Sequence, residues 1–304
     1  MRDLLDESAA HLRQGRVDDA LGPLAVALEA KRSALGPEEW RHWIHKEVRQ
    51  HPIYPILLED PFVRHSATRP RGYPGDAELL DYVYRSENVR ANVDRATPLG
   101  RRLLAYSTAT AAPAAVRHRL SLTVSEIERL GGREGRPHVL SIACGHLREA
   151  ALLKSLRNHR LERFVALDQD PRSLDLVRRE WSGSGIETIE CSAMQFTRQG
   201  RALGKFDFIY ALGLYDYLSD KAAQRLLATA FDMLHPGGKV WIANFIDGIP
   251  AAGYMEAVMD WWLIYRSAEN LEQLAGPLQP SKVASRRTFF EPAGNLAFLE
   301  VVRA

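Results

Sequence analysis

The chain has 304 residues, of which 46% are hydrophobic and 26% charged, proportions that are typical of a globular protein and exclude wholesale disorder. Its 40 basic and 38 acidic side chains leave a formal charge of +2, which argues against nucleic acid or a membrane surface as a partner. Two cysteines, Cys144 and Cys191, cannot build a disulfide framework or a cysteine-based zinc site, and we expect no metal. No stretch reaches the roughly 18 apolar residues of a membrane span, and the charged N-terminal residues lack a signal-peptide core, so we expect a cytoplasmic location.

Helical patterns dominate residues 1–130. A stripe of apolar residues from Val17 to Leu28 predicts one helix, which Gly36 and Pro37 end, and a second helix is expected to start at Pro37. Residues 51–76 contain five prolines and two glycines, and we expect a long ordered loop or a lid there. Helical patterns return at 77–85 and at 98–130, where Pro113 can kink or split the helix.

Short β-rich runs alternate with helical stretches in residues 131–304. The predicted strands are 138–143, 163–167, 186–190, 206–212 and 239–245, and the clearest helices are 170–180 and 220–234. Such alternation predicts a parallel, doubly wound sheet with helices on both faces. A turn at 292–295 between two apolar runs predicts a C-terminal antiparallel hairpin, which makes a sheet of seven strands.

The residues that end the first two strands predict a nucleoside site. Small residues from Ser141 to Gly145 allow the backbone to approach a ligand, and Asp168 follows Gly145 by 23 residues, the spacing of a carboxylate that accepts from ribose hydroxyls. The competing role for Asp168 is a helix N-cap, but Asp170, directly before Pro171, suits that role better. One glycine replaces the three of a dinucleotide loop, which favours S-adenosylmethionine (SAM) over a diphosphate cofactor.

Four segments carry a resemblance to a known family: SIACGHLREA, ALGLYDYLSD, RGYPGDAELLDYVY and MDWWLIYR. Together they resemble a bacterial branch of class I SAM-dependent methyltransferases, the extracellular-factor 3-hydroxypalmitic acid methyl ester biosynthesis proteins. The resemblance covers about residues 50–304, with one departure at His146 and Leu147, where that branch has Pro-Ala. The chain is also similar to enzymes that cyclise SAM to azetidine-2-carboxylate.

The resemblance implies a Rossmann-like catalytic domain over residues 131–304 that binds SAM, with residues 1–130 as a helical cap. The implied cofactor contacts lie at the ends of four predicted strands. The first strand end faces the methionine portion and ribose, the second holds the ribose, the third holds adenine and the fourth lies beside the sulfonium. These residues are Ser141, Ala143, Gly145, Asp168, Gln169, Ser192, Ala193, Met194, Leu212 and Gly213. Met194 either flanks adenine or packs in the core.

The remaining candidates concern the reaction itself. Aromatic faces stabilise a sulfonium, which makes Tyr84, Tyr215 and Tyr265 catalytic candidates, although each can also be a core residue. Substrate contacts are expected from Arg71, Tyr73, Asn244 and Arg266, where the two arginines can clamp a carboxylate or belong to structural ion pairs. His146 is a weak candidate for a base, and Asp76 and Asp216 can accept from an amine, although Asp76 also suits an N-cap.

Two reactions fit this set of residues. The first is O-methylation of a small or fatty carboxylic acid, in which the acceptor carboxylate displaces the sulfonium directly. The alternative is cyclisation, in which the α-amine of SAM attacks its own chain and releases methylthioadenosine. A third possibility is a SAM-binding module without activity. The sequence leaves the acceptor and the oligomeric state open.

Overall fold

The computed structural model describes residues 1–132 and 135–304, and packing divides them into two units. The first unit comprises residues 1–114 and 248–262, and the second comprises residues 115–247 and 263–304. The division differs from the expected boundary after residue 130 in two ways. Most of the helix at residues 111–131 belongs to the second unit, and residues 248–262 belong to the first.

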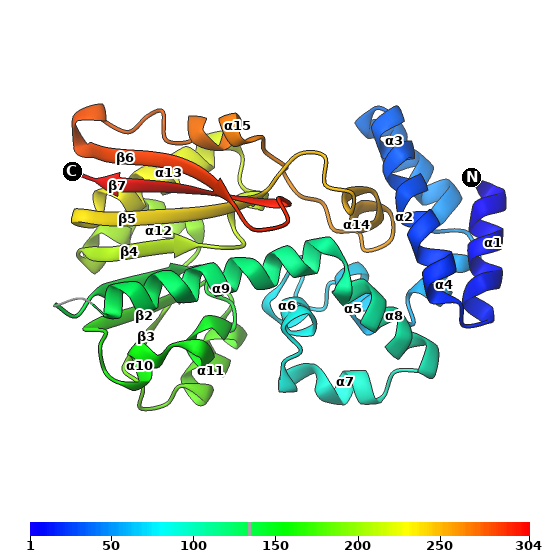
Figure 1. The fold of residues 1–304 in the computed structure, drawn as a ribbon, viewed down its shortest axis with the longest axis horizontal. Coiled ribbons are helices and arrows are strands. Elements are labelled where there is room, and N and C mark those ends of the chain that lie inside the picture. Colours follow the sequence, from blue (N-terminus) through cyan, green and yellow to red (C-terminus); the bar gives the residue numbers. More distant parts are fainter. Residues whose placement is uncertain (133–134) are drawn as a thin grey trace. The chain divides into compact units, whose positions relative to one another are not determined.

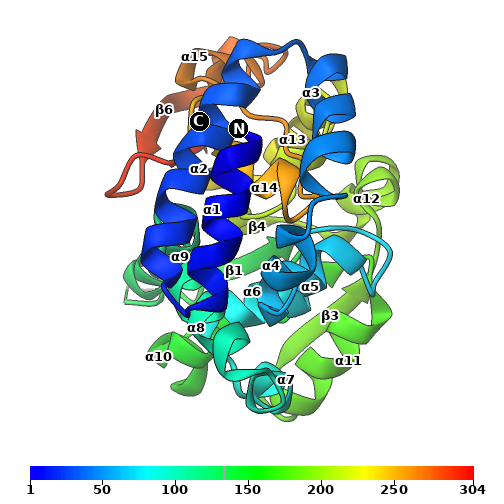
Figure 2. The same ribbon diagram turned by 90° about the vertical axis from the view of Figure 1, so that its right-hand side faces the viewer.

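The first unit is helical. Its helices are α1 (Arg2–Arg13), α2 (Val17–Ala34), α3 (Pro37–Trp43) with a π-helical turn (Ile44–Val48), α4 (Ile53–Leu57), α5 (Pro61–Thr68), α6 (Ala77–Tyr84), a 3-10 turn (Glu87–Val89), α7 (Arg90–Asp94), α8 (Pro98–Ala109) and α14 (Ala252–Ala257). Figure 2 shows α1 and α2 side by side at the start of the chain. The expected helices at residues 17, 37, 77 and 98 are confirmed, and the last expected helix is split at Thr110 into α8 and α9 (Ala111–Gly131).

The segment 51–76 is more helical than expected. Pro61 occupies the first position of α5, where the missing N–H costs nothing, and the Asp60 carboxylate accepts from the Phe62 N–H at 2.9 Å. Residues 69–76 form its longest stretch outside helices, with Gly72 and Gly75 at positive φ. The prolines therefore punctuate short helices here, and the expectation of one long loop was wrong for residues 53–68.

The α14 segment is fastened to the N-terminal helices by one buried carboxylate. Glu256 accepts from Arg32 Nε at 2.9 Å and from Trp40 Nε1 at 2.7 Å. Gly253 lies against α2 so closely that a Cβ would stand 2.6 Å from the Leu28 carbonyl carbon. These contacts explain why residues 248–262 belong with the helical unit.

The second unit contains a seven-stranded sheet, as the sequence predicts (Figure 1). Its strands are β1 (His138–Ile142), β2 (Arg163–Asp168), β3 (Ile186–Glu190), β4 (Phe206–Ala211), β5 (Leu234–Phe245), β6 (Val283–Phe290) and β7 (Leu296–Arg303), in the order β3-β2-β1-β4-β5-β7-β6. The first five strands are parallel, and β7 pairs antiparallel with both β5 and β6.

Helices cover both faces of this sheet, and Figure 1 shows α9 in front of it and α13 behind. The helical segments are η3 (Arg148–Leu152), α10 (Lys154–Arg157), α11 (Pro171–Glu180), α12 (Ala193–Gln199), η4 (Gly200–Leu203), η5 (Tyr215–Tyr217), α13 (Asp220–Asp232), α15 (Ala268–Gln273) and η6 (Pro280–Lys282). No helix in the described ranges is long and apolar enough to cross a bilayer.

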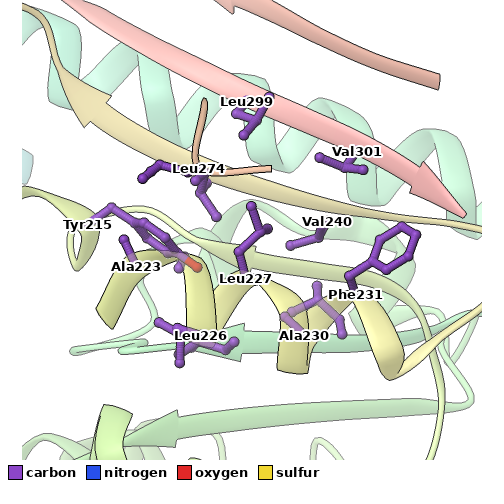
Figure 3. Close-up of a cluster of buried hydrophobic side chains, with 14 of the residues drawn as sticks. Tyr215, Ala223, Leu226, Leu227, Ala230, Phe231, Val240, Leu274, Leu299 and Val301 are labelled. Carbon is purple, nitrogen blue, oxygen red and sulfur yellow. The ribbon is translucent and has the colours of Figure 1, made fainter. Parts of the chain in front are cut away.

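One apolar face of α13 packs onto β5 and β7. Figure 3 shows Leu227 and Phe231 of this helix facing Val240, Leu299 and Val301 of the strands. Burying side chains of this kind contributes about 1.5–3 kcal/mol each. The sheet is thereby held rigid behind the edge where its parallel strands end.

Candidate functional site

The carboxyl ends of β1, β2 and β4 form the candidate site. β1 pairs with β2 on one side and with β4 on the other, so the connections leave β1 in opposite directions at this point. Ligands of open α/β sheets bind in the crevice at such a switch point.

The loop after β1 alternates between two backbone conformations. Ala143, Gly145 and Leu147 have φ values of 55°, 54° and 49°, all left-handed. For a side-chain-bearing residue this conformation costs roughly 1–2 kcal/mol. Ala143 and Leu147 thus adopt a backbone conformation that only glycine adopts readily. Backbone strain of this kind is found mainly at functional sites.

Asp168 ends β2 and is tied to that loop. Its Oδ2 accepts from the Gly145 N–H at 2.8 Å and its Oδ1 from the Asp170 N–H at 2.9 Å. Burial raises the pKa of this carboxyl, and the backbone hydrogen bonds act against the rise. Because a carboxylate oxygen has two acceptor positions, each oxygen can still accept from a ribose hydroxyl. The adjacent helix α11 is capped by Asp170, which accepts from the Arg172 N–H at 3.1 Å, as the sequence predicts.

The end of β3 provides the expected adenine position. Ser192 forms a reciprocal cap at the start of α12, where its Oγ accepts from the Gln195 N–H and its own N–H donates to Gln195 Oε1. Ala193 is the first residue of that helix, and the Met194 side chain is 65% exposed. Gln169 is exposed beside Asp168. Met194 is therefore no core residue, and its thioether chain offers an apolar surface at this edge.

Tyr210 of β4 and Glu149 of η3 form a buried hydrogen-bonded pair next to the loop that follows β1. The Tyr210 hydroxyl donates to Glu149 Oε1 at 2.6 Å, and Ser141, near the end of β1, is 2% exposed. Burial raises the pKa of both Tyr210 and Glu149. The role of Ser141 in binding the cofactor stays a prediction. The role of Glu149 was not foreseen, because nothing in its sequence context distinguishes it from a surface glutamate.

At the end of β4, Leu212 and Gly213 are half-buried and meet Arg119 from α9. Arg119 Nη1 donates to the Leu212 carbonyl at 2.6 Å, and the arginine is 3% exposed. Sequence reasoning missed this residue, since an arginine on an amphipathic helix is ordinarily read as solvent-facing.

Tyr215 does not occupy the catalytic position expected of it. Its ring lies in the core with Ala223 and Leu227, as Figure 3 shows. Burial raises the pKa of its hydroxyl far above the ordinary value. We therefore assign Tyr215 to packing behind the site.

Arg266 and Asn244 are also structural in this fold. Arg266 donates to the Tyr215 and Leu218 carbonyls, to Asn244 Oδ1 and, through Nε and Nη2, to Asp220 Oδ1. These contacts use all five guanidinium N–H groups. The Asn244 amide donates to the Phe245 and Ile264 carbonyls. Neither side chain has a donor left for a substrate carboxylate, which corrects the expectation of a clamp.

Asp216 accepts from the Phe245 N–H at 2.7 Å, and burial raises its pKa to about 6. His146 is buried, with its Nδ1 3.3 Å from Arg148 Nη2. Tyr265 is half-buried in the second unit. The roles of His146, Asp216 and Tyr265 stay predictions.

Four candidates lie in the first unit: Arg71, Tyr73, Asp76 and Tyr84. Arg71 pairs with Glu78 at 3.4 Å, and Tyr73 and Tyr84 are half-buried. Asp76 caps α6 by accepting from the Leu79 N–H at 2.8 Å, and both of its carboxylate oxygens lie 2.9 Å from His65 Nε2. Asp76 is therefore a structural cap, whereas the roles of Arg71, Tyr73 and Tyr84 stay predictions.

Comparison with known proteins points to one class of domain. Residues 139–238 match the family model described as "Methyltransferase domain". None of the curated proteins searched matches the chain.

Several solved structures are similar to this chain at low sequence identity. A possible exported protein from Bordetella parapertussis is 17% identical with a TM-score of 0.54, over 80% of this chain and 95% of that chain. The pyocyanin biosynthetic protein PhzM is 17% identical (TM-score 0.47, 83% and 71% covered), and the magnesium protoporphyrin IX methyltransferase from Synechocystis PCC 6803 with bound SAM is 11% identical (TM-score 0.44, 63% and 83% covered).

Proposed function

We propose that this enzyme methylates a carboxylate oxygen of a small or fatty acid. The proposal starts from the match of residues 139–238 to the methyltransferase-domain model, since class I methyltransferases use SAM. When bound, SAM supplies a methyl group on a positively charged sulfur that leaves readily. The residues present fit this cofactor: Asp168 retains acceptor positions for a diol, the 143–147 loop presents backbone, and Met194 offers an apolar surface.

The observation that carries the choice of acceptor is an apolar edge beside β4 and β5. Tyr217 is 37% exposed and Ile264 is 41% exposed, and the segments that bear them are joined by the Ile264 N–H donating to the Asp216 carbonyl at 2.7 Å. The two exposed side chains thus come from adjoining segments, and exposed apolar side chains that are grouped mark binding surfaces more often than scattered ones do. An acceptor with an acyl chain suits this edge.

The polar groups near the same edge support an acceptor that is already ionised. Tyr215 lies in the core, and Arg266 and Asn244 are occupied by internal hydrogen bonds. Methyl transfer to a carboxylate releases no proton, since a carboxylic acid with a pKa near 4–5 is ionised at pH 7. The residues of the site then have only to align the two partners and exclude water.

The test is incubation of the purified enzyme with SAM and a panel of short-chain and long-chain carboxylic acids, with products followed by mass spectrometry. We expect S-adenosylhomocysteine and a methyl ester in equal amounts, and neither product when the acid is omitted. Methylthioadenosine formed from SAM alone would instead identify the cyclising activity. SAM binding without either product, across the whole panel, would contradict both reactions.

A matched pair of variants checks the acceptor edge. Ile264→Asp places a charge on the apolar edge and is expected to raise the KM for a long-chain acid more than tenfold while leaving SAM affinity unchanged. Val26→Asp alters a side chain that is 72% exposed on α2, and serves as the control.

A further inference from the structure

Arg119 is a buried cation whose hydrogen bonds are mostly unused. Its guanidinium makes one hydrogen bond within the described residues, from Nη1 to the Leu212 carbonyl at 2.6 Å, and its buried Nε has no partner there. A guanidinium has five N–H donors, and a buried donor without an acceptor loses its hydrogen bond to water without gaining another.

Arg266 provides the contrast. It is 2% exposed, about as buried as Arg119 at 3%, yet all of its donors are satisfied by the protein. Arg266 therefore fits a structural role, whereas Arg119 has N–H donors that can bind the acceptor atoms of a ligand.

Neighbouring carboxylates do not supply that acceptor. Glu149 and Asp216 are close enough to interact electrostatically with Arg119, but Glu149 Oε1 accepts from Tyr210 and Asp216 Oδ1 accepts from the Phe245 N–H. No hydrogen bond joins either carboxylate to Arg119 within the described residues.

The position of Arg119 is on the opposite side of β1 from Asp168. Arg119 contacts the end of β4 and Asp168 ends β2, with β1 between them. Adjacent strands are about 4.8 Å apart, so the two strand ends are separated by roughly 10 Å. Gly213 lies against this guanidinium, since a Cβ there would stand 3.7 Å from Nη2.

We propose that Arg119 binds the α-carboxylate of SAM, as the counterpart of Asp168 at the ribose. The separation of the strand ends at Arg119 and Asp168 suits a ligand with a diol at one end and a carboxylate at the other. The planar guanidinium of an arginine can donate two parallel hydrogen bonds to a carboxylate. The proposal rests on SAM as the cofactor and not on the carboxylic acid acceptor.

Calorimetry with unreactive ligands tests this assignment without an acceptor. The ligands are S-adenosylhomocysteine, its decarboxylated analogue 5′-(3-aminopropylthio)adenosine, and methylthioadenosine, which lacks the amino-acid portion. We expect the wild type to bind S-adenosylhomocysteine about 10- to 100-fold tighter than the decarboxylated analogue. In Arg119→Gln this ratio should fall to about one, while the affinity for methylthioadenosine stays within about threefold of wild type.

Thermal unfolding without ligand supplies the second readout. Arg119→Met removes a buried charge with unbonded donors, so its Tm should equal or exceed that of the wild type, whereas Arg266→Met should lower the Tm because it breaks a satisfied network. The assignment is overturned if the carboxylate preference survives in Arg119→Gln, if methylthioadenosine binding weakens as much as S-adenosylhomocysteine binding, or if Arg119→Met destabilises the protein as much as Arg266→Met.

Discussion

Asp168 links the cofactor site to the stability of the loop it holds. Asp168→Ala removes the acceptor that we propose for ribose, and it also removes the acceptor of the Gly145 and Asp170 N–H groups. We expect SAM affinity to fall at least about 100-fold, since hydrogen bonds to a charged group contribute about 1.5–3 kcal/mol each, and the Tm to fall while the fold is retained. Calorimetry and circular dichroism measure the two effects. Asp175→Ala, on the exposed face of α11, should change neither, and unchanged SAM affinity in Asp168→Ala would refute the ribose assignment.

Asp60 is a buried carboxyl whose titration should weaken the fold as the pH rises. Burial raises its pKa to about 7, against the hydrogen bonds from Ser107 Oγ and the Phe62 N–H. Between the ordinary value near 4 and pH 7, the folded protein therefore holds a proton that the unfolded chain releases. The free energy of unfolding should fall across this window, by up to about 1.4 kcal/mol per pH unit from this group.

Asp60→Asn isolates that contribution, because the amide keeps the shape of the helix cap without a titrating proton. Urea unfolding at pH 4.5, 5.5 and 6.5 is expected to show a smaller loss of stability with pH in Asp60→Asn than in the wild type. Parallel pH profiles for the two proteins would show that Asp60 is already ionised at pH 4.5.

Residue roles were predictable where local chemistry decides them. Pro171 marks Asp170 as the cap, which leaves Asp168 for the ligand. The role of Tyr215 was not predictable in the same way, because the segment after β4 folds as a 3-10 turn instead of an extended strand, and the turn directs Tyr215 into the core. Arg119 and Arg266 differ only in their tertiary partners, which no local pattern reveals.

At the scale of elements, the contact of α14 with α2 depends on the absence of a side chain at residue 253. Gly253→Ala would place a Cβ 2.6 Å from backbone atoms of Leu28 and Glu29, so the helices must separate. Overpacking of this kind costs typically 1–3 kcal/mol. Gly22→Ala is the matched control within α2, because a Cβ there meets only the Tyr106 hydroxyl, at 3.7 Å, and alanine favours a helix by up to about 1 kcal/mol. Thermal melts should show opposite shifts, and a Gly253→Ala Tm equal to wild type would contradict the close approach.

Element types followed from periodicity, whereas some boundaries did not. The helix expected at 220–234 ends at Asp232, and β5, expected from residue 239, already begins at Leu234. Contacts with β4 explain the early start of β5. The Phe206 N–H donates to the Met233 carbonyl, and Phe206 pairs with Leu234. The prolines in 51–76 led us to expect too little helix, because Pro52 and Pro61 stand at the starts of α4 and α5.

At the scale of the whole molecule, a seven-stranded sheet that is mostly parallel and ends in an antiparallel hairpin was predictable, whereas the membership of residues 248–262 was not. Alternating strands and helices followed by a hairpin lead to one familiar arrangement, which the structure has. In contrast, the return of α14 to the N-terminal helices depends on Glu256 meeting Arg32 and Trp40, more than 200 residues away in the chain.

That return makes the helical unit dependent on a segment encoded after β5. A fragment of residues 1–114 leaves Arg32 Nε and Trp40 Nε1 without their acceptor and exposes the α2 face that α14 covers. We expect this fragment to melt broadly and at a lower temperature than the same fragment joined to residues 248–262 through a long Gly/Ser linker. Glu256→Ala in the linked fragment should remove much of the gain, because losing the acceptor leaves two buried donors unsatisfied. Equal, sharp melting of the short and linked fragments, followed by circular dichroism, would show that the N-terminal helices form their core without α14.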